Sequence, residues 1–160
     1  MKAFIFAAGK GTRLKPFTDK HPKALAKVNN ITLLERNIKF LQSFGINDFI
    51  INIHHFGEQI VDFLKENNNF GAKIEISDES EELLETGGAL VFAKKLLEQE
   101  ELFLIMNADI LTNLNIGDFI NFHLKSNNLV TLAVSDRKSS RKLLFDSAMT
   151  LQGWRNEKTG

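Results

Sequence analysis

The chain begins with the run Ala3-Phe4-Ile5-Phe6-Ala7-Ala8, which leads directly into Gly9-Lys10-Gly11-Thr12-Arg13. The first part is continuously apolar over a short length, which is typical of a strand. The two glycines permit positive φ and close approach, so backbone N–H groups can converge on an anion there. Arg13 and, after Pro22, Lys23 add a planar guanidinium and a compact ammonium. This stretch therefore predicts a strand followed by a phosphate-binding loop.

Two common glycine motifs do not match these residues. A dinucleotide-binding fingerprint needs a third small residue where Leu14 stands, and an acidic residue at the end of the second strand, where Asn52-Ile53-His54 stand. A Walker loop needs the pattern G-x-x-x-x-G-K-[ST], which does not occur in the sequence. An ordinary strand-to-helix turn often contains two glycines, but it does not require the basic residues and prolines that follow here. The loop is therefore a nucleotide loop of another kind.

The segments Phe6–Thr18 and Pro22–Leu25 together resemble the signature of the sugar-1-phosphate nucleotidyltransferases. Enzymes of that family join a sugar-1-phosphate to a nucleoside triphosphate, with the help of Mg²⁺, and release pyrophosphate. Two later segments, Leu84–Ala89 and Met106–Asp109, are similar to the nucleotide-binding and metal-binding motifs of the family. Their order and spacing agree with the family, so the resemblance covers most of the chain.

The resemblance implies a site residue by residue. Lys23 is expected at the α-phosphate and the attacking phosphate, and Arg13 at the triphosphate and the departing pyrophosphate. Asp109 is expected to hold Mg²⁺, and Asn107 to contact substrate. The attacking group is already a phosphate oxyanion, so no general base is needed. The expected nucleotide-binding set is Ala7, Ala8, Gly9, Lys10, Gly11, Thr12, Arg13, Lys23, Glu85, Gly87 and Gly88.

Several of these residues also fit simpler structural roles. Asp109 could instead be a turn or helix-cap aspartate, and Asn107 could simply end its strand. Gly87 and Gly88 have the alternative of a plain helix start. The adjacent His54 and His55 point to opposite faces of an extended segment, so a structural or solvent role is favoured over joint metal binding.

Composition limits the class of protein. The chain has 160 residues with 20 basic and 20 acidic side chains and a formal net charge of zero, which argues against a nucleic-acid footprint and for a small-molecule partner. It contains no cysteine, so disulfides and thiolate metal sites are excluded. We expect neither a signal peptide nor a membrane anchor, and a cytoplasmic location.

Apolar runs alternate with amphipathic stretches. This pattern predicts a Rossmann-like doubly wound α/β fold, a mainly parallel sheet with helices on both faces, formed as a single domain over residues 1–160 and truncated on its C-terminal side. Strands are expected at residues 2–8, 48–53, 73–78, 102–106 and 129–135, with 73–78 at an edge. Helices are expected at about 32–44, 57–66, 86–97 and 115–126, and a hairpin from 142–146 and 149–154. In such a sheet, the predicted site residues meet at the carboxyl ends of the strands.

The family's second metal aspartate lies in a later segment that finds no match here. We therefore expect a fragment of a longer enzyme, and the alternative is a shortened relative that binds nucleotide without efficient turnover. The Leu84–Gly88 segment is closest to uridylyl- and guanylyltransferases acting on N-acetylmuramate, hexose or heptose phosphates, which favours UTP or GTP and a product used for cell-envelope polysaccharide. A choline-phosphate cytidylyltransferase shares the first motif and stays open as an alternative. An exposed sheet edge makes an oligomer possible.

Overall fold

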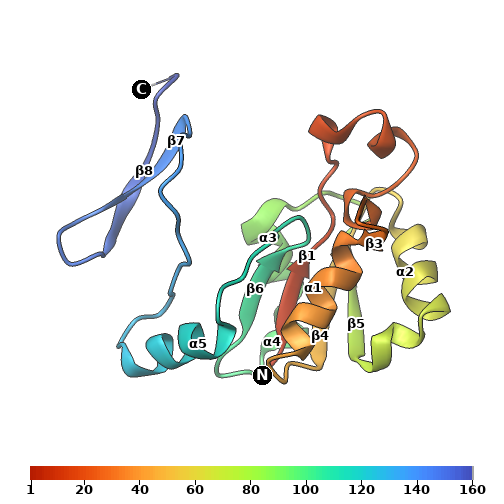
Figure 1. The fold of residues 1–160 in the computed structure, drawn as a ribbon, viewed down its shortest axis with the longest axis horizontal. Helices are drawn as coiled ribbons and strands as arrows, with labels where there is room; N and C mark the ends of the chain where they lie inside the picture. Colours follow the sequence, from red (N-terminus) through yellow and green to blue (C-terminus); the bar gives the residue numbers. More distant parts are fainter. Residues whose placement is uncertain (160) are drawn as a thin grey trace. The chain divides into compact units, whose positions relative to one another are not determined.

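The computed structural model describes residues 1–159 and divides the chain into two compact units, Met1–Asp118 and a second that begins at Phe119. The first unit contains a four-stranded sheet in the order β5-β4-β1-β6, in which every neighbouring pair is parallel (Figure 1). The strands are β1 (Ala3–Phe6), β4 (Asp48–Ile53), β5 (Lys73–Asp78) and β6 (Leu104–Asn107). This confirms the predicted Rossmann-like α/β fold and the edge position of residues 73–78. The single domain over the whole chain stays a prediction.

The register of the sheet brings three strand ends level with one another. Phe6, the last residue of β1, pairs with Asn52 of β4 on one side and with Asn107 of β6 on the other. The central strands are buried on both faces, which is why they read as nearly unbroken apolar runs rather than as alternating sequences. Polar residues that follow these strands therefore lie along one edge of the sheet.

Helices cover the two faces of the sheet because crossovers between parallel strands are right-handed. The chain moves outward from β1 through α1 (Leu33–Gln42) to β4 and through α2 (Gly57–Glu66) to β5, which places both helices on one face (Figure 1). It then returns to the other side of β1 through α3 (Glu85–Phe92) and α4 (Lys94–Leu97), which lie on the opposite face. There the core consists of Phe4, Ile50, Ala89, Ala93 and Leu97.

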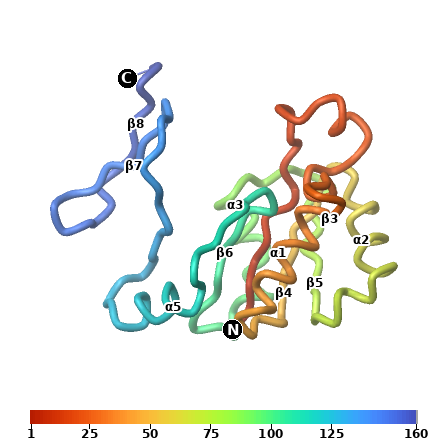
Figure 2. The backbone as a smooth tube through the Cα atoms, viewed as in Figure 1, coloured from red at the N-terminus to blue at the C-terminus, as the bar shows by residue number. Residues whose placement is uncertain are grey.

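The segment between β1 and α1 is a long loop with short turns of 3-10 helix, which the sequence did not predict. These turns are η1 (Thr12–Leu14), η2 (Phe17–Asp19) and η3 (Lys23–Leu25), and a small antiparallel pair, β2 (Lys27–Val28) and β3 (Ile31–Thr32), follows them. Figure 2 shows this loop, in red and orange, beyond the end of β1. Thr32 then starts α1, because its hydroxyl oxygen accepts a hydrogen bond from the Glu35 N–H at 3.1 Å.

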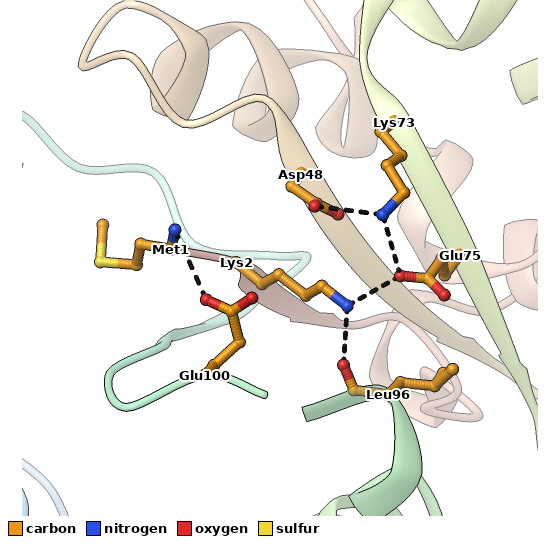
Figure 3. Close-up of polar contacts among 7 residues, drawn as sticks. All are labelled: Met1, Lys2, Asp48, Lys73, Glu75, Leu96 and Glu100. Carbon is orange, nitrogen blue, oxygen red and sulfur yellow. Dashed lines mark hydrogen bonds and ion pairs between the residues drawn. The ribbon is translucent and has the colours of Figure 1, made fainter. Parts of the chain in front are cut away.

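A cluster of charged side chains stabilises the end of the sheet where its parallel strands begin (Figure 3). Lys2 donates to the Glu75 carboxylate at 2.9 Å and to the Leu96 carbonyl at 2.7 Å, which ties β1 to β5 and α4. The hydrogen bond to Glu75 raises the pKa of Lys2, and the same bond lowers the pKa of Glu75. Lys73 adds ion pairs to Asp48 and Glu75. These charges lie at the amino ends of the strands, away from the predicted site.

Other boundaries differ from the predictions in detail. The helix expected at 86–97 is two helices, because Ala93 leaves the helical region with φ −79° and ψ 6°. The 3-10 turn η4 (Asn68–Gly71) joins α2 to β5. No helix within residues 1–159 combines the length and the apolar character that crossing a membrane would take.

The second unit contains the end of α5 (Ile116–Lys125) and the predicted hairpin, formed by β7 (Arg141–Phe145) and β8 (Leu151–Asn156). The strand expected at residues 129–135 is wrong, because that segment has no regular structure. A strand needs a neighbour for its backbone groups, and within residues 1–159 this segment pairs with none. Its apolar side chains are consequently exposed, with Leu129 at 99% and Val130 at 71%.

Candidate active site

A cavity of about 270 Å³ opens at the carboxyl ends of the strands. It lies beside β1, the strand at which the strand order of the sheet reverses. From β1 the chain first adds β4 and β5 on one side of the sheet, and then adds β6 on the other side of β1. Ligands of doubly wound sheets bind in this crevice, because the loops after the two adjacent strands separate there. The residues that line the cavity are Phe6, Ala7, Ala8, Gly9, Lys23, Ala24, Asn52, Glu79, Leu83, Glu85, Thr86, Asn107, Ala108 and Asp109.

The glycine loop presents free backbone donors. Within residues 1–159, the N–H groups from Gly9 to Arg13 donate to no other protein group. Gly11 has φ +61° and directly precedes η1, and its carbonyl accepts hydrogen bonds from the Leu14 N–H at 2.8 Å and the Thr18 hydroxyl at 3.0 Å. A left-handed residue between such donors curves the backbone toward an anion-binding concavity. The loop therefore has the donors that the sequence predicted for a phosphate.

Lys23 and Asp109 form an ion pair at the mouth of the cavity. The lysine begins η3, and the aspartate follows β6, so two segments far apart in sequence supply opposite charges to one point. The Lys23 side chain is 28% exposed and that of Asp109 is 39% exposed, so both remain open to a ligand. The predicted phosphate-binding cation and the predicted metal ligand are thus direct neighbours.

The backbone that carries Asp109 is fixed from two sides. The Ala108 N–H donates to the Phe6 carbonyl at 3.0 Å, which continues the β1–β6 ladder past the end of the strand. The side-chain amide of Asn37, which is 2% exposed on α1, donates to the Ala108 carbonyl at 2.8 Å and more weakly to that of Asn107 at 3.4 Å. Asn37 was not predicted, although a polar residue on the apolar face of its helix was a signal.

The floor of the cavity contains two buried polar residues that were not predicted either. Asn52 and Glu79 are each 2% exposed and line the cavity, and the Asn52 amide donates to the Glu79 carboxylate at 2.8 Å. Asn52 is the one polar residue in an otherwise apolar stretch of β4 from Phe49 to Ile53, which was a usable signal. Glu79 directly follows β5, where its burial could not be distinguished from the solvated acids beside it.

The structure brings only part of the predicted site to the cavity. Ala7, Ala8, Gly9, Lys23, Glu85, Asn107 and Asp109 line it. Gly87 is exposed, and it and Gly88 lie within α3 rather than on the cavity wall. Residues 10–13 form the loop beyond the cavity, and Arg13 is exposed on η1.

The two adjacent histidines lie outside the cavity lining. The Nδ1 of His54 donates to the Glu79 carbonyl at 2.7 Å, which gives this histidine a structural contact. The rings of His55 and Phe56 contact each other, with centroids 4.0 Å apart and ring planes tilted by 43°. These contacts agree with the structural role that the sequence favoured.

The donor set at Asp109 suits a hard divalent cation. An exposed carboxylate at the end of a strand can exchange the Lys23 ammonium for a metal ion, and both charges stay compensated when a phosphate takes that ammonium. One carboxylate together with substrate phosphates is a usual way to hold Mg²⁺. Asp109 therefore fits the predicted role of a protein ligand to Mg²⁺.

Comparison with known proteins identifies the family of the chain. The sequence model of the family described as "Nucleotidyl transferase" matches residues 2–143. The chain belongs to this family. A mannose-1-phosphate guanyltransferase of Gibberella zeae is 32% identical over 137 residues, or 84% of this chain and 37% of that protein. An N-acetylmuramate alpha-1-phosphate uridylyltransferase of Neisseria meningitidis is 37% identical over 115 residues, or 72% of this chain and 49% of that protein.

Two further matches extend the comparison. A choline-phosphate cytidylyltransferase of Streptococcus pneumoniae is 49% identical over 78 residues, or 49% of this chain and 33% of that protein. The crystal structure of HddC from Yersinia pseudotuberculosis complexed with GMP-PN matches with a TM-score of 0.73 at 22% identity, over 98% of this chain and 74% of that one. The chain spans between one third and one half of the length of these curated relatives. The family and the fold are therefore shown.

Proposed function

We propose that the protein joins a sugar-1-phosphate to a nucleoside triphosphate, with UTP or GTP favoured, and gives an NDP-sugar and pyrophosphate. The observation that carries this proposal is the Lys23–Asp109 pair at the sheet crevice, next to a loop whose N–H groups are free. Such a site offers a cation for a phosphate, a carboxylate for a metal and a row of donors for a phosphate chain. Nucleotidyl transfer requires little else, because positioning and electrostatics do most of the work.

The transfer is a substitution at the α-phosphorus. An oxygen of the sugar phosphate forms the new P–O bond, and the bond from the α-phosphorus to the bridging oxygen of the β-phosphate breaks. The electron pair leaves with pyrophosphate, and no proton has to move. The backbone from Gly9 to Thr12 and the guanidinium of Arg13 bind the departing phosphates, and Lys23 stabilises the charge on the α-phosphate.

Lys23 changes partner when nucleotide enters. In the free protein its ammonium is neutralised by Asp109. A phosphate competes for this ammonium, and Asp109 is then available to hold Mg²⁺, which when bound neutralises phosphate charge and helps to orient the phosphate chain. The exchange keeps each charge compensated throughout, so neither residue is left unpaired at the mouth of the cavity.

The proposal also covers the residues that contact the sugar or the nucleoside, the cellular location of the reaction and an alternative pair of substrates. Asn107 and Glu85 contact the sugar or the nucleoside, a role supported by their position in the cavity lining. The reaction takes place in the cytoplasm, where nucleoside triphosphates are made, and its product serves cell-envelope polysaccharide. The 49% identity to a choline-phosphate cytidylyltransferase over 78 residues favours one further candidate, CTP with phosphocholine.

The test is pyrophosphate release by the chain with a panel of the four nucleoside triphosphates, paired with hexose-1-phosphates, N-acetylmuramate-1-phosphate and phosphocholine. Release with one sugar phosphate pair is expected. It should fall by at least about a hundredfold in Lys23→Met and stay unchanged in Lys20→Met, an exposed lysine that does not line the cavity. If calorimetry shows nucleotide binding but no pair of nucleoside triphosphate and acceptor releases pyrophosphate, the result would instead support the alternative, a relative that binds nucleotide without efficient turnover.

A further inference from the structure

The side chain of Asn52 connects two loops that line the cavity. Its oxygen accepts a hydrogen bond from the Ala7 N–H at 2.7 Å and a longer one from the Ala8 N–H at 3.4 Å. Its amide donates to the Glu79 carboxylate at 2.8 Å. Both polar ends of one buried amide are therefore used, one toward the segment after β1 and the other toward the segment after β5.

Glu79 is held in place through every polar group it has. Its N–H donates to the Ile53 carbonyl at 2.9 Å, and its own carbonyl accepts from His54 at 2.7 Å. One carboxylate oxygen accepts from Asn52, and the other accepts from the Leu84 N–H at 3.4 Å, just before the start of α3. A buried carboxylate without partners would be strongly destabilising, so this arrangement depends on Asn52.

The contacts of Asn52 also determine which backbone N–H groups after β1 remain free for a ligand. Because Asn52 occupies the Ala7 N–H and, less closely, the Ala8 N–H, the amides free for a ligand begin at Gly9. Ala7 and Ala8 are 5% exposed, and they line the cavity beside Asn52 and Glu79. They form its fixed floor rather than its anion-binding part.

We propose that Asn52 is a positioning residue for the nucleotide: it holds the Ala7–Ala8 backbone and the Glu79 carboxylate at fixed places in one cavity wall. This inference rests on the proposed function for the identity of the ligand. Neither Lys23 nor Asp109 is bonded to Asn52 or Glu79. Loss of the bridge therefore weakens nucleotide binding in the ground state and the transition state alike, which raises KM and leaves kcat nearly unchanged.

The test exchanges the donor and the acceptor of the hydrogen bond between residues 52 and 79. In Asn52→Asp the new carboxylate still accepts from the Ala7 N–H, but it faces the Glu79 carboxylate in a buried place, and the two must share a proton. In the double variant Asn52→Asp/Glu79→Gln, the glutamine amide donates to the aspartate, and the glutamine oxygen accepts from the Leu84 N–H. The double variant thus restores one carboxylate, one amide and each bond of the bridge.

Nucleotide affinity is measured by calorimetry at several pH values, with the nucleotide that the wild type binds best. Asn52→Asp is expected to bind at least about tenfold more weakly at pH 8, and to recover as the pH falls and the pair gains its proton. The double variant is expected to lie within about threefold of the wild type and to lose this additional pH dependence. The other titratable groups near the bridge, Lys23, Glu85, Asp109 and His54, are present in all the variants.

The single variant Glu79→Gln completes the cycle, and far-UV circular dichroism establishes that each variant is folded. The Asn52 inference is overturned if the wild type binds nucleotide and Asn52→Asp binds it equally well, or if the double variant is no better than Asn52→Asp. If Asn52→Asp does not fold, Glu79→Leu decides, because leucine has no oxygen to accept from the Asn52 amide. An unchanged KM and affinity in a folded Glu79→Leu protein then overturn the inference. A wild type that binds no nucleotide overturns the proposed function, and this inference with it.

Discussion

Gly11 is the position at which the predicted phosphate-binding loop, residues 9–13, and the Lys23 side chain lie closest together. Its φ of +61° is in the left-handed region, and a Cβ built there would lie 2.9 Å from the Cβ of Lys23 and 2.9 Å from the Cγ2 of Thr18. Neither atom is the free end of a flexible side chain. In Gly11→Ala the backbone of the loop must therefore move, and it must move against the residue that carries the predicted cation.

The cost has two parts that a control variant separates. A left-handed alanine costs about 1–2 kcal/mol, and insertion of a methyl group into an occupied space costs about 1–3 kcal/mol more. Gly45 has φ +81° with no heavy atom within 4 Å of its built Cβ, so Gly45→Ala carries only the first cost. We expect the unfolding free energy to fall by about 1–2 kcal/mol in Gly45→Ala and by about 2–5 kcal/mol in Gly11→Ala.

Urea unfolding followed by far-UV circular dichroism measures both changes, because α1 to α4 all lie in the first unit. The alanine methyl must gain about 0.5 Å to reach ordinary contact at 3.4 Å instead of 2.9 Å. A misplacement of about 1 Å can cost a hundredfold in rate, so this shift of Lys23 should cost about tenfold in pyrophosphate release. A Gly11→Ala protein no less stable than Gly45→Ala, and equally active, would refute this account of the loop.

Three other perturbations test separate parts of the structure. Lys23→Met should bind free Mn²⁺ several-fold more tightly, measured by electron paramagnetic resonance, because Asp109 loses its competing cation. The same variant should bind nucleotide about tenfold more weakly, measured by calorimetry. An unchanged Mn²⁺ affinity would contradict the pairing of Lys23 with Asp109. Glu75→Gln should lower the unfolding free energy by about 0.5–1 kcal/mol at pH 7. Since Lys2 lowers the folded-state pKa of Glu75 from 4.5, this contribution is present above pH 4.5 and is lost as the pH falls through the lowered value, so urea midpoints of the two proteins should converge in acid. Thr32→Ala should cost about 1 kcal/mol through loss of the helix cap, and an unchanged urea midpoint would show that the cap is unimportant.

The sheet and its helices were predictable because their sequence signals are strong. Buried parallel strands read as apolar runs, and the hydrophobic spacing of α1 and α2 identified both helices. Residues 129–135 form a similar, mostly apolar run. They have no partner strand within residues 1–159, and sequence alone does not reveal whether a partner exists. A strand is a property of a pair, so this prediction was wrong for a reason that local pattern could not detect.

The contacts that hold the site follow a different rule, which Asn52 illustrates. An asparagine within the apolar stretch Phe49–Ile53 must be buried, because its neighbours on both sides of the sheet are buried. A buried amide must find both a donor and an acceptor, and at the carboxyl end of a central strand these come from the adjoining loops. Its presence therefore indicated a second residue of opposite hydrogen-bonding character in the cavity wall. The identity of that residue, Glu79, depends on how the segment after β5 returns toward β4, which only the fold supplies.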